Sequence, residues 1–322
     1  QMKFGMGTVM AKFAALIGCA SLVLAVSHGV GHTLQASAEV VSVMPLGPEC
    51  ARRAEALPAQ IDAAIEAEAG GDRLVRQIVP CLRVSDPAVR DGFAYTSLAR
   101  LLRGGAVSME ERRRLLRELL ADLSPDALDM HGFGKPFAAL VLSEVARTDR
   151  VAPWMMAAER KALVETGAAY LEDVTDYRGF IDGEGWRHGV AHGADLLMQL
   201  SLNEAVDEAD AARMLAAIGS QVAPRDAPAY VFDEPRRLSR PLLFLTQRGL
   251  LGEDELTAWF ETMGDPAPLA SWDDAFSSEG ALARRHNLRA FAYAVLASAT
   301  ESDDENLKKL RPGALHLLTT IP

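Results

Sequence analysis

Aromatic residues, β-branched clusters and the common catalytic motifs are scarce or missing in this 322-residue sequence. Aromatic residues make up 6% of the chain, whereas alanine and leucine are abundant, so β-strands have little local support. The sequence contains no phosphate-binding loop, no dinucleotide-binding fingerprint and no G-x-S-x-G motif. The usual sequence signatures of nucleotide-binding enzymes and of serine hydrolases are therefore absent.

Positive charge is also in deficit. The chain has 33 Lys and Arg residues against 44 Asp and Glu residues, which gives a net charge of −11. Binding to nucleic acid irrespective of its sequence needs clusters of Lys and Arg that neutralise phosphates. We therefore expect no nucleic-acid partner.

The N-terminal segment has the pattern of a secretory signal peptide. Lys3 and Lys12 give it a positive start, an apolar run follows over residues 13–26, and Ala36-Ser37-Ala38 fits the small-residue rule for cleavage. The apolar run is short for a membrane span. We expect residues 1–38 to be a cleaved signal peptide, which leaves an exported, periplasmic protein with no stable membrane span.

Cysteine is limited to three residues. Leu16-Ile17-Gly18-Cys19 resembles a lipoprotein box, so a lipid anchor at Cys19 is the alternative localisation. It ranks second because the residues that follow Cys19 are apolar, whereas a lipidated cysteine is normally followed by a polar tether. In an oxidising compartment, the other two cysteines, Cys50 and Cys81, predict one disulfide bond, and two buried free thiols are the alternative.

Amphipathic segments with short breaks fill the rest of the chain. Ser85-Asp86-Pro87 is a typical helix start, and Ser108 with Glu111 matches a capping box. Helices are expected around residues 61–68, 73–82, 88–102, 136–147, 153–166, 186–200, 208–223, 235–248, 253–263 and 282–299. Helix pairs recur about every 40–50 residues, the range of HEAT-type arrays. The sequence therefore predicts one all-α domain over residues 39–322, an irregular HEAT-like stack of helical hairpins (an α-solenoid or superhelix), with loosely held ends at 39–60 and 300–322.

Ionisable side chains are densest over residues 176–195. On the helix predicted there, His188, His192 and Asp195 fall on one face, and nearly all other side chains are apolar or small. A polar stripe on such a helix is costly to bury unless its groups are paired or have a function. We predict that the stripe faces a polar concavity shared with Arg178.

The stripe allows three kinds of chemistry. His188 and His192, four residues apart, can chelate one divalent metal ion, with Asp195 as a third ligand or as a group that orients them. The metalloprotease pattern H-E-x-x-H is absent, because Gly189 stands where its general base would be. The three residues could also act as general acid and base. The third and commonest arrangement is a buried hydrogen-bond network between neighbouring helices.

Further residues around the stripe are candidates for ligand binding: Asp176, Arg178, Trp186, Glu234 and Arg237. An arginine near a tryptophan and acidic groups can bind a carboxylate or a phosphate. A structural salt bridge between Arg178 and Asp176 or Asp182 is the alternative. Glu234 and Arg237 lie at a predicted helix start, where acidic groups are favoured, and could face the concave side opposite His188.

Three stretches carry a longer pattern: C-L-R-V-S-D-P-A-V-R-D-G-F-A-Y-T-S-L at 81–98, D-Y-R-G-F with G-W-R-H-G-V-A-H-G-A-D-L-L within 176–197, and F-D-E-P-R-R-L at 232–238. Their order and spacing resemble the bacterial domain of unknown function 2785 (DUF2785) family over about residues 80–245. A family Arg-Ser-Phe motif is replaced here by Lys135-Pro136-Phe137. The resemblance implies an all-α fold and no particular activity.

Two classes of function fit these features. The first is a binding scaffold that presents a polar concave site around residues 186–195 to a peptide, a protein or a small anionic ligand. The alternative is a hydrolase-type enzyme that uses His188, His192 and Asp195 as metal ligands or as general acid and base. We favour the scaffold because helical stacks usually present surfaces, and because the sequence does not supply a full catalytic set.

Overall fold

The computed structural model describes residues 46–322 of the chain. The predicted signal peptide and the alternative lipid anchor at Cys19 lie outside this range. Fourteen helices make up most of it: α1 (Leu46–Ala56), α2 (Pro58–Glu66), α3 (Asp72–Ile78), α4 (Thr96–Arg103), α5 (Met109–Asp122), α6 (Gly134–Val151), α7 (Ala157–Glu172), α8 (Gly189–Ser201), α9 (Glu208–Val222), α10 (Glu234–Gln247), α11 (Glu253–Gly264), α12 (Glu279–Glu301), α13 (Glu305–Lys308) and α14 (Leu310–Thr320). Over the same residues, no helix combines the length and the apolar character that a membrane crossing requires.

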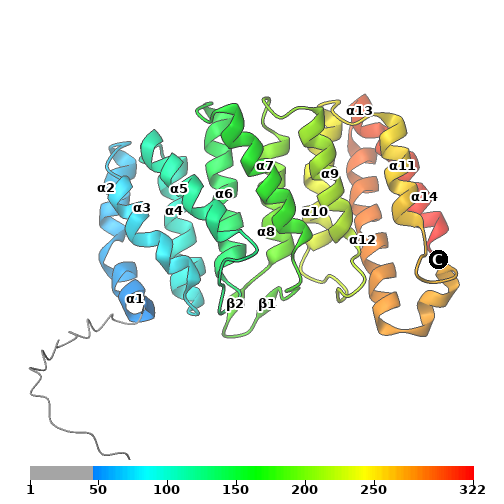
Figure 1. Cartoon of the computed structure of the whole chain (residues 1–322), viewed down its shortest axis with the longest axis horizontal. Coiled ribbons are helices and arrows are strands. Elements are labelled where there is room, and N and C mark those ends of the chain that lie inside the picture. The colour runs from blue at the N-terminus through cyan, green and yellow to red at the C-terminus, as the bar shows by residue number, and fades with distance from the viewer. Residues whose placement is uncertain (1–45) are drawn as a thin grey trace, which may run out of the picture. The chain divides into compact units, whose positions relative to one another are not determined.

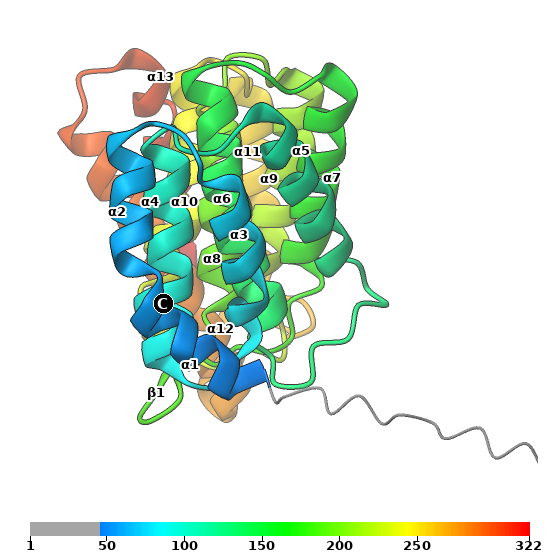
Figure 2. The same cartoon turned by 90° about the vertical axis from the view of Figure 1, so that its left-hand side faces the viewer.

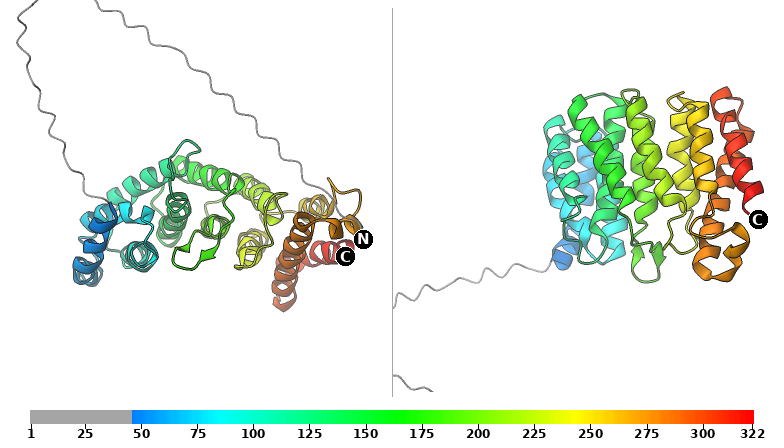
Figure 3. Two further views of the ribbon diagram at one scale, coloured as in Figure 1. Left: turned by 90° about the horizontal axis from the view of Figure 1, so that it is seen from below. Right: turned by 45° about the vertical axis from the view of Figure 1, so that its right-hand side comes forward.

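The helices lie side by side in two layers (Figure 1). One row consists of α4, α6, α8, α10 and α12, in which each helix packs against the next. The other row includes α5, α7 and α9, which pack against α6, α8 and α10 respectively. Figure 2 looks along the rows from the α1–α2 end, and Figure 3 shows that the described helices follow a curve. The all-α prediction is confirmed.

One continuous hydrophobic core lies between the rows. Each helix of the α4–α12 row contributes at least one side chain with no exposed surface: Leu98, Leu142, Leu197, Leu242 and Phe291. Burying one such side chain stabilises the fold by roughly 2 kcal/mol. The apolar periodicity read from the sequence therefore corresponds to the faces that build this core.

Two features tie down the ends of the described chain. Cys50 in α1 and Cys81 in the 3-10 helix Val79–Arg83 form the predicted disulfide bond, with Cα atoms 5.6 Å apart. Closing this loop contributes about 3–4 kcal/mol in loop-entropy models. At the other end, α14 buries Leu310, Ala314 and Leu317. The expectation of loose ends is wrong for residues 46–60 and 305–320, because both segments form helices with buried anchors.

A small β-hairpin interrupts the helices at the entrance to α8. Strands β1 (Phe180–Ile181) and β2 (Gly185–Trp186) pair antiparallel, and the turn between them places Gly183 and Gly185 at positive φ. Strand β2 includes Trp186, the first residue of the helix predicted over 186–200. For this reason α8 begins at Gly189 and not at Trp186.

The π-helix Ala88–Tyr95 holds this hairpin in place. Its fully buried Arg90 donates from Nη2 to the Glu184 carbonyl oxygen at 2.7 Å, and Asp91 Oδ2 accepts from the Trp186 backbone N–H at 3.3 Å. π-helical turns are frequent at functional sites. The structure thus joins two of the three stretches that carry the family resemblance.

Candidate functional site

Residues 176–195 divide into two parts that face different surroundings. Residues 176–187 lie at the ends of the helices, where loops enclose a cavity. His188, His192 and Asp195 instead turn into the row formed by α6, α8 and α10. None of these three residues lines a hollow to which Arg178 belongs. Arg178 and the stripe of His188, His192 and Asp195, which were predicted to share one concavity, therefore lie in two separate places.

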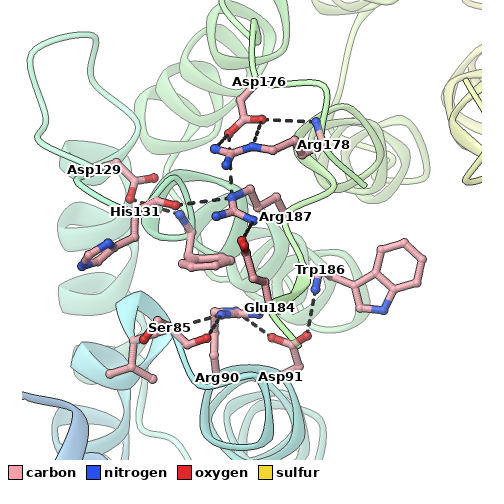
Figure 4. Close-up of polar contacts among 12 residues, drawn as sticks. Ser85, Arg90, Asp91, Asp129, His131, Asp176, Arg178, Glu184, Trp186 and Arg187 are labelled. Atoms are coloured by element: carbon pink, nitrogen blue, oxygen red, sulfur yellow. Dashed lines mark hydrogen bonds and ion pairs between the residues drawn. The ribbon is translucent and has the colours of Figure 1, made fainter. Parts of the chain in front are cut away.

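The first place, which we call the loop-end cavity, has a volume of about 990 Å³. The segment before α6, the α7–α8 connection and the hairpin form its walls. Its polar lining consists chiefly of Asp129, His131, Lys135, Asp176, Arg178, Glu184 and Arg187, and its apolar lining includes Phe133, Tyr170 and Val174. Figure 4 shows Arg187 between Asp176 and Glu184, with the Trp186 ring pointing away from this network.

Arg187 is the most deeply placed cation of the cavity, with 5% of its surface exposed. It donates from Nη1 to Glu184 Oε2 at 2.7 Å and from Nε to the His131 carbonyl oxygen at 3.3 Å. Its guanidinium carbon lies 4.2 Å from the centre of the Phe133 ring. None of the described residues accepts a hydrogen bond from Nη2, and this nitrogen is not sealed from solvent. Arg187 therefore lines the cavity and keeps one donor that is neither paired nor sealed from solvent.

Asp176 and Arg178 form a two-contact ion pair at the mouth of the cavity. Arg178 donates from Nε to Asp176 Oδ1 at 2.7 Å and from Nη2 to Oδ2. Burial opposes the ionised form of Asp176, but hydrogen bonds from Arg178 outweigh it and hold the pKa of Asp176 below its ordinary value. Gly132, at φ 72°, lies against this pair, and a Cβ atom there would come 2.9 Å from Asp176 Oδ2. The pair therefore needs a glycine beside it.

The second place begins at His188, directly before α8. His188 has φ 55°, a left-handed conformation that is uncommon for residues other than glycine. Its ring stacks on Trp186, with centroids 4.7 Å apart, and its Nε2 lies 3.6 Å from Glu234 Oε1 without a hydrogen-bond partner. Burial, together with the charge of Arg237, lowers the pKa of His188 to about 4. His188 is therefore neutral at neutral pH.

His192 is buried one turn further along α8. Its Nδ1 lies 3.1 Å from the Pro136 carbonyl oxygen, so the neutral ring donates from Nδ1 and keeps its lone pair on Nε2. Phe137 contacts the ring edge-on. Burial, and then the neighbouring His188, lower the pKa of His192 to about 3. The Lys135-Pro136-Phe137 segment, where the chain departs from the family motif, is thus the segment that holds His192.

Asp195 links α8 to α10. It forms an ion pair with Arg237 and lies 3.9 Å from Arg240. Burial raises its pKa, and the charge of Arg237 opposes that rise. Within residues 46–322, no group of three or more His, Cys, Asp or Glu residues is arranged to hold a metal ion. A metal role for His188, His192 and Asp195 gains no support from this geometry and stays a prediction.

Glu234 and Arg237, at the start of α10, both contact residues at or in α8, and the concave side predicted for them opposite His188 stays a prediction. Glu234 approaches His188 and accepts from the Phe232 backbone N–H at 2.9 Å, whereas Arg237 pairs with Asp195. Sequence reasoning missed Arg187. The only signal was its place beside Trp186 in the segment where ionisable residues are densest.

Comparisons with known proteins place the chain in a family. Residues 119–296, more than half of the chain, match the family model described as Protein of unknown function (DUF2785). No curated protein and no solved structure matches the chain. The matched range contains the hairpin, α8, the start of α10 and every residue lining the loop-end cavity except Ser85. The resemblance seen in the sequence is confirmed, and the chain belongs to the DUF2785 family.

Proposed function

We propose that the protein is a binding scaffold that holds an anionic group of a small ligand or peptide in the loop-end cavity. The observation that carries this proposal is Arg187, a nearly buried arginine that lines a cavity of about 990 Å³ and keeps an unpaired Nη2. A guanidinium group binds carboxylates and phosphates through paired N–H donors. The volume falls within the range common for ligand cavities, although this cavity is more polar than most.

The cavity combines this donor with surfaces for the rest of a ligand. Phe133 and Tyr170 supply aromatic wall, and Met130 on the rim is 87% exposed. Glu184, which now pairs with Arg187, lies in the exposed hairpin turn. An incoming carboxylate would bind Nη2 and compete with Glu184 for the guanidinium. The ligand we expect is therefore a carboxylate attached to an apolar or aromatic body.

The same proposal extends to architecture and location. The helix pairs α5–α6, α7–α8 and α9–α10 pack in chain order, which supports an irregular HEAT-like solenoid that presents loops at one end. The disulfide between Cys50 and Cys81 supports action in an oxidising compartment, such as the periplasm.

Isothermal titration calorimetry with N-acetyl-phenylalanine, against its neutral amide, tests the proposal. We expect saturable binding of the carboxylate and binding of the amide that is weaker by about tenfold or more, because a charged hydrogen bond is lost. Arg187→Gln should lower the affinity by about 10- to 100-fold. Arg213→Gln is the control, because Arg213 pairs with Glu165 and Glu172 and does not line the cavity. The proposal would be overturned if the carboxylate and the amide bound with equal affinity. It would also be overturned if Arg187→Gln bound the carboxylate as tightly as wild type does.

The second candidate function is hydrolase-type chemistry at His192. The specific observation is that the Pro136 carbonyl oxygen accepts a hydrogen bond from His192 Nδ1. The lone pair of Nε2 is therefore free to accept a proton. An imidazole with a pKa near 3 is a weak general base, since the best catalytic pKa lies near the working pH. This function therefore ranks below ligand binding.

A further inference from the structure

A second hollow, which we call the aromatic groove, lies between the hairpin and the segment before α10. It has a volume of about 540 Å³. Its lining includes Tyr177, Phe180, Tyr230 and Phe232, together with the carboxylic residues Asp176 and Glu234. Asp176 and Arg178 line both hollows, but Arg187 lines only the loop-end cavity and Glu234 only the groove, so variants at these two residues test the two proposals separately.

One of the residues that line the groove is nearly buried and acidic. Glu234 has 3% of its surface exposed, and Oε2 accepts a hydrogen bond from Phe232. Apart from the backbone of Glu234 itself, none of the described residues other than Phe232 donates a hydrogen bond to this carboxyl group. Glu234 therefore keeps hydrogen-bonding capacity at a residue that lines the groove.

Glu234 also lacks a cation among the described residues. Its nearest basic group is His188, 3.6 Å away, which is neutral at neutral pH. Arg178 lines the groove as well, but it is paired with Asp176 and the two charges cancel. A buried carboxylate without a countercharge is costly, so a positively charged ligand would relieve a cost already present in the fold.

The aromatic walls are held firmly. Trp186 packs edge-on behind both Phe180 and Phe232, with ring centroids 5.2 Å and 5.8 Å away. The Phe232 ring lies so close to Gly179 that a Cβ atom there would come 2.0 Å from it. Tyr177 and Tyr230 face each other at 6.2 Å. Rigid aromatic rings beside a carboxylate are the arrangement that recognises alkylammonium cations.

We propose that the aromatic groove binds an alkylammonium group, with Glu234 as its countercharge and the aromatic rings as its walls. The group can belong to a small quaternary amine or to the side chain of a lysine. Val231 and Phe180 at the mouth are exposed and would contact the apolar part of either ligand.

Calorimetric titration with choline, compared with 3,3-dimethylbutan-1-ol, separates charge from shape, because the two have nearly the same size. We expect saturable binding of choline and an affinity for the neutral alcohol that is weaker by about tenfold or more. N-acetyl-lysine methylamide is the third probe. Tighter binding of choline supports a small amine as the ligand, and tighter binding of the lysine compound supports a peptide side chain.

Glu234→Gln is the decisive variant, because glutamine keeps the shape and can still accept from Phe232. It should lower the affinity for choline by about tenfold or more, with helicity unchanged by circular dichroism. If this variant does not fold, Phe180→Ala changes only a partly exposed wall and should lower the affinity by about two- to fivefold. Asp226→Asn, an exposed carboxylate outside the groove, should bind choline like wild type. Equal affinity for choline and the alcohol, or wild-type affinity in Glu234→Gln, would overturn the proposal.

Discussion

Residues 176–187 and residues 188–195 are neighbours in the sequence and similar in charge, but the fold uses them differently. In the first region, Asp176, Arg178, Glu184 and Arg187 pair with one another around an open cavity. In the second, buried side chains pair across helices, as Asp195 does with Arg237. A dense run of ionisable residues thus shows where polar groups must be satisfied. It does not show whether the protein or a ligand satisfies them.

The largest expected difference between the regions is in stability. Asp195→Ala should lower the free energy of unfolding by about 2–3 kcal/mol, because it removes the ion pair of a largely buried carboxylate with Arg237. Asp176→Ala, at a pair that is more than one-third exposed, should change it by less than about 1 kcal/mol. Urea unfolding of both variants measures this difference. Equal losses would remove the distinction between the two regions.

His192→Ala distinguishes a structural from a metal role for the second region. In the structural role, loss of the contact with Pro136 should lower the free energy of unfolding by about 1–3 kcal/mol, because the carbonyl is left unsatisfied. In the metal role, the variant should lose bound metal while its helicity stays nearly intact. Elemental analysis of protein purified without a His tag, combined with thermal unfolding, makes the measurement. If the variant lost neither bound metal nor stability, both the structural role and the metal role of His192 would be wrong.

The buried histidines predict a distinct pH dependence. The pKa of His192 falls from its ordinary value near 6.5 to about 3 in the folded state, so the unfolded chain holds more protons between these values. His192 should therefore make stability fall as pH decreases through this window, by up to about 1.4 kcal/mol per pH unit. The raised pKa values of Asp195 and Glu234 act in the opposite direction, which makes a comparison with a variant necessary.

That comparison uses His192→Gln, which removes the titrating ring and keeps a polar side chain. As pH falls from 6.5 to 4, the unfolding free energy of wild type should decrease relative to that of this variant. Imidazole NMR signals of His192 should show no titration above pH 5. A ring that titrates near pH 6.5 would contradict the burial described for it.

A smaller effect is expected at the glycines of the first region. Gly132 and Gly183 both have positive φ, but only Gly132 lies against the Asp176–Arg178 pair, and nothing lies within 4 Å of a Cβ atom at Gly183. Gly183→Ala should cost about 1 kcal/mol from backbone strain alone, and Gly132→Ala about 1 kcal/mol more. Gly132→Ala should also weaken carboxylate binding in the cavity. Identical behaviour of the two variants would show that the contact at Gly132 has no consequence.

The sequence predicted the parts of this fold that follow from periodicity and capping. The helix intervals were close to those observed, and Ser108 caps α5 by accepting from the Glu111 N–H, because these signals are local in the chain. The pairing of Cys50 with Cys81 followed from their number and their expected compartment.

The division of residues 176–195 could not be predicted, because it depends on contacts distant in sequence. Arg90, 94 residues before Glu184, holds the hairpin that delays the start of α8. The left-handed backbone of His188 then turns the chain, so that Arg187 faces the loops and His192 faces α6. None of these contacts has a local sequence signal, and a single helical face was therefore the natural expectation.

The most direct test compares one arginine from each region for binding and for stability. N-acetyl-phenylalanine is titrated into Arg187→Gln and Arg237→Gln, and the unfolding free energy of each variant is measured in urea. We predict that Arg187→Gln loses about 10- to 100-fold in affinity, because its donor serves the cavity, and also loses about 1–3 kcal/mol of stability with its bonds to Glu184 and His131. Arg237→Gln should keep its affinity within about twofold and lose about 1–3 kcal/mol of stability, because Asp195 loses its partner. The reverse result, with binding lost only in Arg237→Gln, would contradict the assignment of the ligand site to the loop-end cavity.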